Sequence, residues 1–168
     1  MNDAHLHLVV NHFPIIGPIL ALGVLVAGMI LKNNSVKSTA YGLFIVSAIF
    51  AAISAGTGDG AEEAVKNLPG VTRKIIHIHE EMADKLAIIL YLLGVISIGG
   101  IYLSLKNHPK AKLVSYAALV VAVVGIYFAK EVGTTGGEIR HTEIRSDATQ
   151  TAATATGEQS KTEDKDKD

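Results

Sequence analysis

The sequence predicts an all-α integral membrane protein that crosses the bilayer four times as an up-down four-helix bundle. Its 168 residues are 49% hydrophobic, and its mean hydropathy is +0.35. Four stretches contain no Asp, Glu, Lys or Arg: 13–31, 38–58, 86–105 and 113–129. A bilayer core about 30 Å thick is crossed by roughly 20 apolar residues of helix. A soluble bundle needs polar residues on its outer helix faces, which these stretches lack, so we predict four membrane spans.

Each span has its own boundary signals. The first begins at Phe13, where a following proline is tolerated in the first helical turn. The second follows a short polar turn at 32–37. The third is expected to begin ahead of the membrane, near Thr72. The fourth follows a tight turn at 107–109 and is expected to end near Gly133.

Two domains and an orientation follow from the charges. Residues 1–145 form the four-span domain, and the polar residues 146–168 are predicted to be a disordered tail. The turns at 32–37 and 106–112 contain lysines and no acidic residue. The positive-inside rule therefore places both turns in the cytoplasm and both termini on the outer side. Nothing basic precedes the first span, so we interpret it as an anchor and not as a cleaved signal peptide.

Composition excludes several functions. The net charge of −1 gives no case for binding nucleic acid. The absence of cysteine excludes disulfides, iron–sulfur clusters and covalent c-type haem. The spans hold no Asp, Glu, Lys or Arg at mid-depth, which argues against a transporter or channel. We expect a redox or binding subunit without catalytic activity of its own.

Six of the seven histidines fall on the predicted outer side, and His108 falls in the cytoplasmic turn. The six precede the first span, precede the third span or follow the fourth span. Three segments of the chain therefore converge at one end of the bundle. Imidazole binds iron, copper and zinc well, and ligands in bundles come from facing helices. These are the expected cofactor or metal ligands: His7, His12, His79 and His141.

Helical spacing separates the candidates. His79 shares an apolar face that should point into the bundle, whereas His77 lies on a charged face and is expected to be solvated or ion-paired. His12 lies at the membrane boundary. His7 can share the site if its segment is helical, and His5 is expected to be frayed near the terminus. The residues that share the face of His79 are Ile75, Ile76, Met82, Ala83 and Leu86.

Glycines and basic residues lie near these histidines. Gly136 and Gly137 follow the fourth charge-free stretch. They either cap the helix or allow close approach of backbone to a flat ligand, and both interpretations stay open. Arg73 and Arg140 lie at the same predicted depth. They could pair with ligand carboxylates such as haem propionates, or they could be ordinary interfacial residues.

The chain resembles a family of uncharacterised bacterial four-span membrane proteins, known as a domain of unknown function. The resemblance rests on an H-x4-H-F-P-I opening, a histidine before the third span, and a Gly-Gly-Glu segment with a histidine after the fourth. It implies a multi-pass protein of the bacterial inner (cytoplasmic) membrane, with a histidine-ligated redox centre holding haem b. The chain differs from the family pattern at Glu80, Glu81 and Thr142. The matching residues are His7, His12, Phe13, Pro14, Ile15, His79, Gly136, Gly137, Glu138 and His141.

Three functions therefore compete. The first is a haem-b-binding electron-transfer subunit, whose partners are the lipid bilayer and other membrane or periplasmic redox proteins. The second is a non-haem copper, zinc or iron site, which the carboxylates of Glu80, Glu81 and Asp84 would favour. The third is a structural subunit of a larger membrane complex, whose histidines are only solvated or hydrogen-bonded.

Overall fold

The computed structural model describes residues 2–145 and residue 150, and this part of the chain contains helices and no strand. The predicted disordered tail, 146–168, lies outside the described residues apart from Gln150. In chain order the elements are α1 (Asp3–Val10), α2 (Phe13–Ile30), α3 (Asn34–Gly56), α4 (Gly58–Val65), α5 (Arg73–Leu105), α6 (Ala111–Arg140) and the short 3₁₀ turn η1 (Thr142–Ile144).

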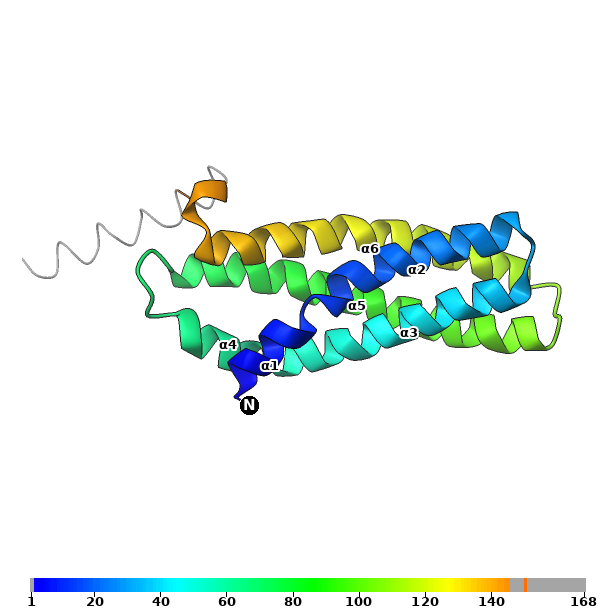
Figure 1. Cartoon of the computed structure of the whole chain (residues 1–168), viewed down its shortest axis with the longest axis horizontal. Coiled ribbons are helices and arrows are strands. Elements are labelled where there is room, and N and C mark those ends of the chain that lie inside the picture. Colours follow the sequence, from blue (N-terminus) through cyan, green and yellow to red (C-terminus); the bar gives the residue numbers. More distant parts are fainter. Residues whose placement is uncertain (1, 146–149, 151–168) are drawn as a thin grey trace, which may run out of the picture.

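The four long helices lie side by side as a bundle (Figure 1). Helix α2 packs against α3 and α6, and α5 also packs against both α3 and α6. Four segments are long and apolar enough to cross a membrane: Asp3–Ile30, Asn34–Gly56, Arg73–Leu105 and Ala111–Arg140. The all-helical class and the four apolar helices are thus confirmed, whereas the side of the membrane on which the termini lie stays a prediction.

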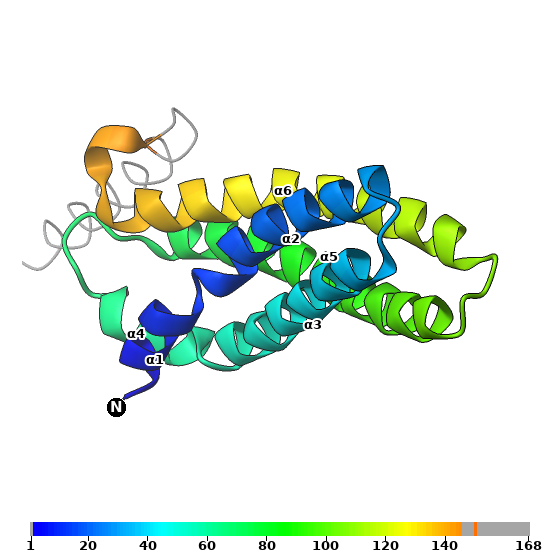
Figure 2. The ribbon, with the colours of Figure 1, turned by 45° about the vertical axis from the view of Figure 1, so that its right-hand side comes forward.

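The bundle has two distinct ends. One end, here called the turn end, carries the α2–α3 turn at 31–33 and the α5–α6 turn at 106–110. The opposite end, here called the histidine end, carries α1, α4, the first turns of α5 and the last turns of α6. Figures 1 and 2 both show α1 and α4 beside each other at the histidine end, and these two short helices pack together.

Small residues let the long helices approach closely. Tyr41 of α3 and Leu90 and Leu93 of α5 are fully buried in the core. A Cβ placed on Gly100 of α5 would lie 2.7 Å from the ring of Tyr41, so the tyrosine packs directly on the glycine backbone. The Tyr41 hydroxyl is hydrogen-bonded to Ser115 Oγ of α6 at 2.8 Å. These contacts lock α3, α5 and α6 together near the turn end.

The helix boundaries depart from the sequence prediction at two places. Helix α6 continues through Gly133 to Arg140, so the expected end near Gly133 is wrong. Its last turns lie beyond the charge-free stretch, where Thr135 contacts His79 of α5. The segment between α3 and α5, for which the sequence predicted no helix, contains the helix α4. The predicted start of the third span is confirmed, because Thr72 is the N-cap of α5 and its side chain accepts a hydrogen bond from Ile75 N–H.

Candidate histidine site

His7 is fixed against the end of α3. Helix α1 begins after Asn2, whose side chain caps it by accepting from the backbone N–H of His5. The half-buried imidazole of His7 points from α1 toward α3. Its Nδ1 lies 3.0 Å from the carbonyl oxygen of Ser54 and 3.1 Å from Thr57 Oγ1. The sequence predicted that His7 can share the site if its segment is helical, and this segment is the helix α1.

These contacts assign the His7 tautomer. A carbonyl oxygen only accepts hydrogen bonds, so Nδ1 carries the hydrogen and donates it to Ser54. The hydroxyl of Thr57 also faces helix carbonyls, at 3.0 Å from both Ile53 O and Ser54 O. The hydroxyl hydrogen is used there, which leaves its oxygen to accept from His7. In the neutral imidazole the other ring nitrogen, Nε2, then holds a lone pair.

His79 is fixed in the same way against α6. The half-buried imidazole on α5 places Nδ1 3.2 Å from Thr135 Oγ1. The Thr135 hydroxyl donates within its own helix to Glu131 O at 2.9 Å. Nδ1 of His79 is therefore the donor to Thr135, and its Nε2 also holds a lone pair.

Gly136 provides the room for the His79 ring. A Cβ at Gly136 would lie 3.0 Å from His79 Cε1 and 3.3 Å from Nδ1, which is tighter than an ordinary contact. Gly136 lies inside α6, so the interpretation of this glycine as a helix cap is wrong. The flat group that its backbone approaches is the imidazole itself. Gly137 instead faces Ile144, with 3.2 Å between its Cβ position and Ile144 Cδ1.

The two imidazoles influence each other. His7 and His79 lie close enough for the charge of one to act on the other, although 72 positions separate them in the chain. A nearby polar atom is also left over: Asn11 Oδ1, one helical turn after His7, is buried without a hydrogen-bond partner. Two lone pairs and one spare polar atom therefore gather at the histidine end.

The other two candidate ligands lie on the surface. His12 is exposed, and its Nδ1 faces the carbonyl oxygen of Leu8 in its own segment at 3.2 Å. His141 is also exposed, and its Nδ1 pairs with Glu143 Oε1 at 3.0 Å. No group of three or more His, Cys, Asp or Glu side chains positioned to hold a metal ion occurs among the described residues. The structure thus brings together His7 and His79 and does not place His12 or His141 with them in such a group.

The histidines predicted to be peripheral are exposed. His77 lies on the outer face of α5 with its Nδ1 3.6 Å from Glu80 Oε2. This contact and the burial of Ile75, Ile76 and Leu86 confirm the separation of the two faces of α5. His5 is exposed near the start of α1, and His108 is exposed in the turn at the other end of the bundle. Arg73 and Arg140 are exposed at the histidine end.

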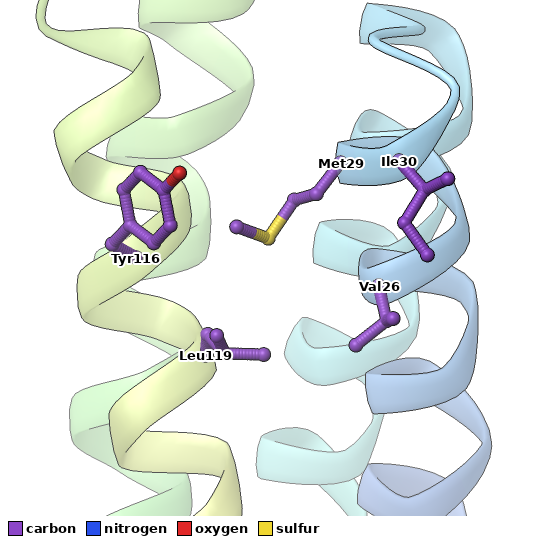
Figure 3. Close-up of a pocket in the computed structure, with 5 residues that line it drawn as sticks. All are labelled: Val26, Met29, Ile30, Tyr116 and Leu119. Atoms are coloured by element: carbon purple, nitrogen blue, oxygen red, sulfur yellow. The ribbon is translucent and has the colours of Figure 1, made fainter.

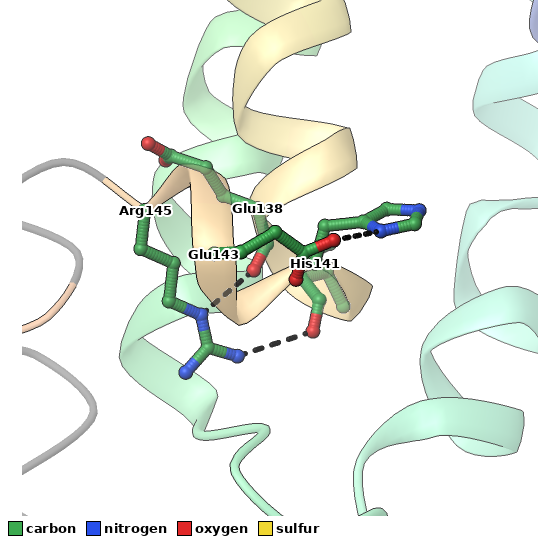
Figure 4. A network of polar contacts seen from close by, with 5 residues as sticks. Glu138, His141, Glu143 and Arg145 are labelled. Atoms are coloured by element: carbon green, nitrogen blue, oxygen red, sulfur yellow. Dashed lines mark hydrogen bonds and ion pairs between the residues drawn. The ribbon is translucent and has the colours of Figure 1, made fainter.

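Arg145 is a structural residue that the sequence prediction missed. Figure 4 shows it folded back over the end of α6. Its Nε donates to the Glu138 carbonyl oxygen at 2.9 Å, and its Nη2 donates to Gly70 O at 2.8 Å. The loop before α5 is thereby tied to the end of α6. Close to Arg145, the carboxylate of Glu143 accepts hydrogen bonds from the backbone N–H of Glu143 and from His141. These hydrogen bonds hold the pKa of Glu143 below its usual value.

Two hollows elsewhere involve none of the histidines. One, of about 290 Å³, lies between α2 and α6 and is lined by apolar side chains and Tyr116 (Figure 3). The other, of about 540 Å³, lies at the turn end between α3 and α5, where most of the lining residues have hydroxyl or amide side chains. Neither contributes a group to the histidine pair.

No family model, no curated protein and no solved structure matches this chain. The fold and the site therefore define the class. Four helices that are long and apolar enough to cross a membrane are compatible with a multi-pass membrane protein in a lipid environment. A pair of imidazoles, each hydrogen-bonded to a neighbouring helix, lies at one end of its bundle.

Proposed function

We propose that this chain is a multi-pass membrane protein that binds haem b through His7 and His79 and serves as an electron-transfer subunit. One observation carries the proposal: two half-buried imidazoles on separate helices each direct Nδ1 to a hydrogen-bond partner on a neighbouring helix, which would make Nε2 the ligating atom. Metal-ligating histidines nearly always have this arrangement, because the second hydrogen bond fixes the ring and makes Nε2 more basic.

The number of available ligands favours haem over a bare ion. A structural zinc site uses four protein ligands and a catalytic one uses three. The histidine pair offers two imidazoles, and no larger His, Cys, Asp or Glu group is found in the part of the chain that the structure describes. A porphyrin supplies four nitrogens of its own, so iron in haem needs only two axial ligands from the protein.

The surrounding residues suit this role. Ser54 and Thr135 hold the two rings from α3 and α6, so neither ring depends on the cofactor for its orientation. Asn11 offers a spare polar group for a ligand atom or a bound water. Arg73 and Arg140 are exposed at the same end and could pair with propionates. Bound haem would supply a one-electron redox couple, which the partner redox proteins would reduce and oxidise.

The test is an absorption spectrum of the detergent-solubilised protein from haem-sufficient cells, recorded before and after dithionite, together with elemental analysis. The proposal predicts a Soret band that shifts on reduction and iron bound together with porphyrin. Bound copper, zinc or iron without porphyrin absorbance would contradict haem and favour the metal-ion alternative. A colourless, metal-free protein would contradict both and favour a structural subunit.

A further inference from the structure

The short helices α1 and α4 lie together at the histidine end and are here called the lid (Figures 1 and 2). Gly60 of α4 lies so close to Asp3 of α1 that a Cβ at this glycine would overlap the aspartate side chain. The two helices pack mainly on each other, to a small extent on the end of α3, and still less on α5 or α6. The lid is therefore joined more closely within itself than to the bundle.

The lid buries little surface that would hold it in place. Val10 is the one buried residue of α1, and α4 has none, although both helices are described in full. At the same end of the bundle, α5 buries Ile75 and Ile76, and α6 buries Val132. A helix of eight residues is not stable alone in water, and a segment with few buried apolar contacts opens at low free energy. The lid is thus the part of the histidine end that should open most easily.

Breaks between helices lie where the lid joins the bundle. Thr57 ends α3 and begins α4, and its backbone leaves the α-helical region at φ −111° and ψ 0°. Asn11 and His12 separate α1 from α2. These two breaks lie near each other, because His7, one helical turn before Asn11, contacts Thr57. The third connection, at 66–72, is an irregular loop. The lid can therefore swing about the line that joins the first two breaks.

The two imidazoles of the histidine pair lie on opposite sides of this hinge. His7 belongs to the lid, and its Nδ1 contacts Ser54 O and Thr57 Oγ1 at the end of α3. His79 belongs to the bundle, where Thr135 of α6 holds its ring. We propose that α1 and α4 open as one unit, which carries His7 away from His79 and admits a ligand to the pair. A ligand that binds both imidazoles then closes the lid, because it binds only the closed arrangement.

Amide hydrogen exchange of the full chain in detergent, followed by mass spectrometry, tests the opening. In the wild type, α1 and α4 should exchange at least about tenfold faster than 77–84 of α5 and 131–137 of α6. Those reference segments also lie at the histidine end, outside or near the edge of the charge-free stretches. Equal exchange in the lid and the reference segments would overturn the proposal.

Two pairs of variants test whether the lid moves as one unit. Thr57→Val removes the hydroxyl that His7 contacts, and its control is Thr39→Val at the turn end, where the hydroxyl also donates to the carbonyl four residues earlier. Relative to this control, Thr57→Val should speed exchange in both α1 and α4 by about fivefold. Gly60→Ala pushes α1 from α4 and should also speed both, relative to Gly58→Ala, whose Cβ meets nothing within 4 Å. A rise confined to one of the two helices would overturn the single unit.

A last arm adds haemin and rests on the proposed function. The Soret band reports binding, and hydrogen exchange reports the lid. Haemin should slow exchange in α1 and α4 of the wild type and leave it unchanged in His79→Ala, although His79 lies outside the lid. Bound haemin without slower exchange would overturn closure of the lid on a ligand. If haemin does not bind, the proposed function fails, and the Thr57→Val and Gly60→Ala variants still decide whether the lid opens as a unit.

Discussion

Replacing Gly136 with alanine tests how the His79 ring is held. The added Cβ would lie 3.0 Å from Cε1 and 3.3 Å from Nδ1 of the imidazole, so the ring must move by a few tenths of an ångström. That movement stretches a hydrogen bond to Thr135 that is already 3.2 Å long. The lost hydrogen bond and the overpacking together cost about 1–3 kcal/mol.

Gly133→Ala is the matched control, one turn earlier in α6. Its Cβ would meet only Ile15 Cγ2, at an ordinary distance of 4.0 Å. Both variants gain the same helix propensity, up to about 1 kcal/mol, so their difference isolates the contact with His79. Thermal unfolding in detergent, followed by far-UV circular dichroism, should show Gly136→Ala to be less stable than Gly133→Ala by about 1–3 kcal/mol. Equal stability of the two variants would refute the packing argument.

Two further substitutions test other contacts. Gly100→Ala places a methyl group 2.7 Å from a buried tyrosine ring, whereas Gly99→Ala meets nothing within 4 Å. The first should lower the free energy of unfolding by about 1–3 kcal/mol relative to the second, and the opposite order would contradict the packing of α3 on α5. Arg145→Gln removes the hydrogen bond to Gly70 O, so amide hydrogen exchange in the loop before α5 should rise severalfold. Arg73→Gln, at an exposed position, is the control and should leave this exchange unchanged. Unchanged exchange in Arg145→Gln would mean that this tie does not order the loop.

The sequence alone predicted those features of the fold that depend on the helical period within one segment. The charge-free stretches predicted the four long helices, and helical spacing on α5 separated half-buried His79 from exposed His77. Both results depend on positions within one segment. Local sequence determines these, because a helix of known period places each residue on one face.

Tertiary contacts decided the rest of the candidate site. His7 joins it because α1 docks against the end of α3, and the sequence gives no local signal for that docking. His12 and His141 have equally promising positions in the sequence, yet both lie exposed. Arg145 was missed because its partners are backbone carbonyl oxygens, which every residue possesses.

Haem content in single-histidine variants tests the central claim most directly. His7→Ala and His79→Ala are purified alongside His12→Ala and His141→Ala, with circular dichroism to confirm that each variant is helical. Pyridine haemochrome assay then gives the haem bound per protein. The account predicts that the first two variants lose haem while the second two keep the wild-type amount. Loss of haem in His12→Ala or His141→Ala, with full retention in His7→Ala and His79→Ala, would contradict it.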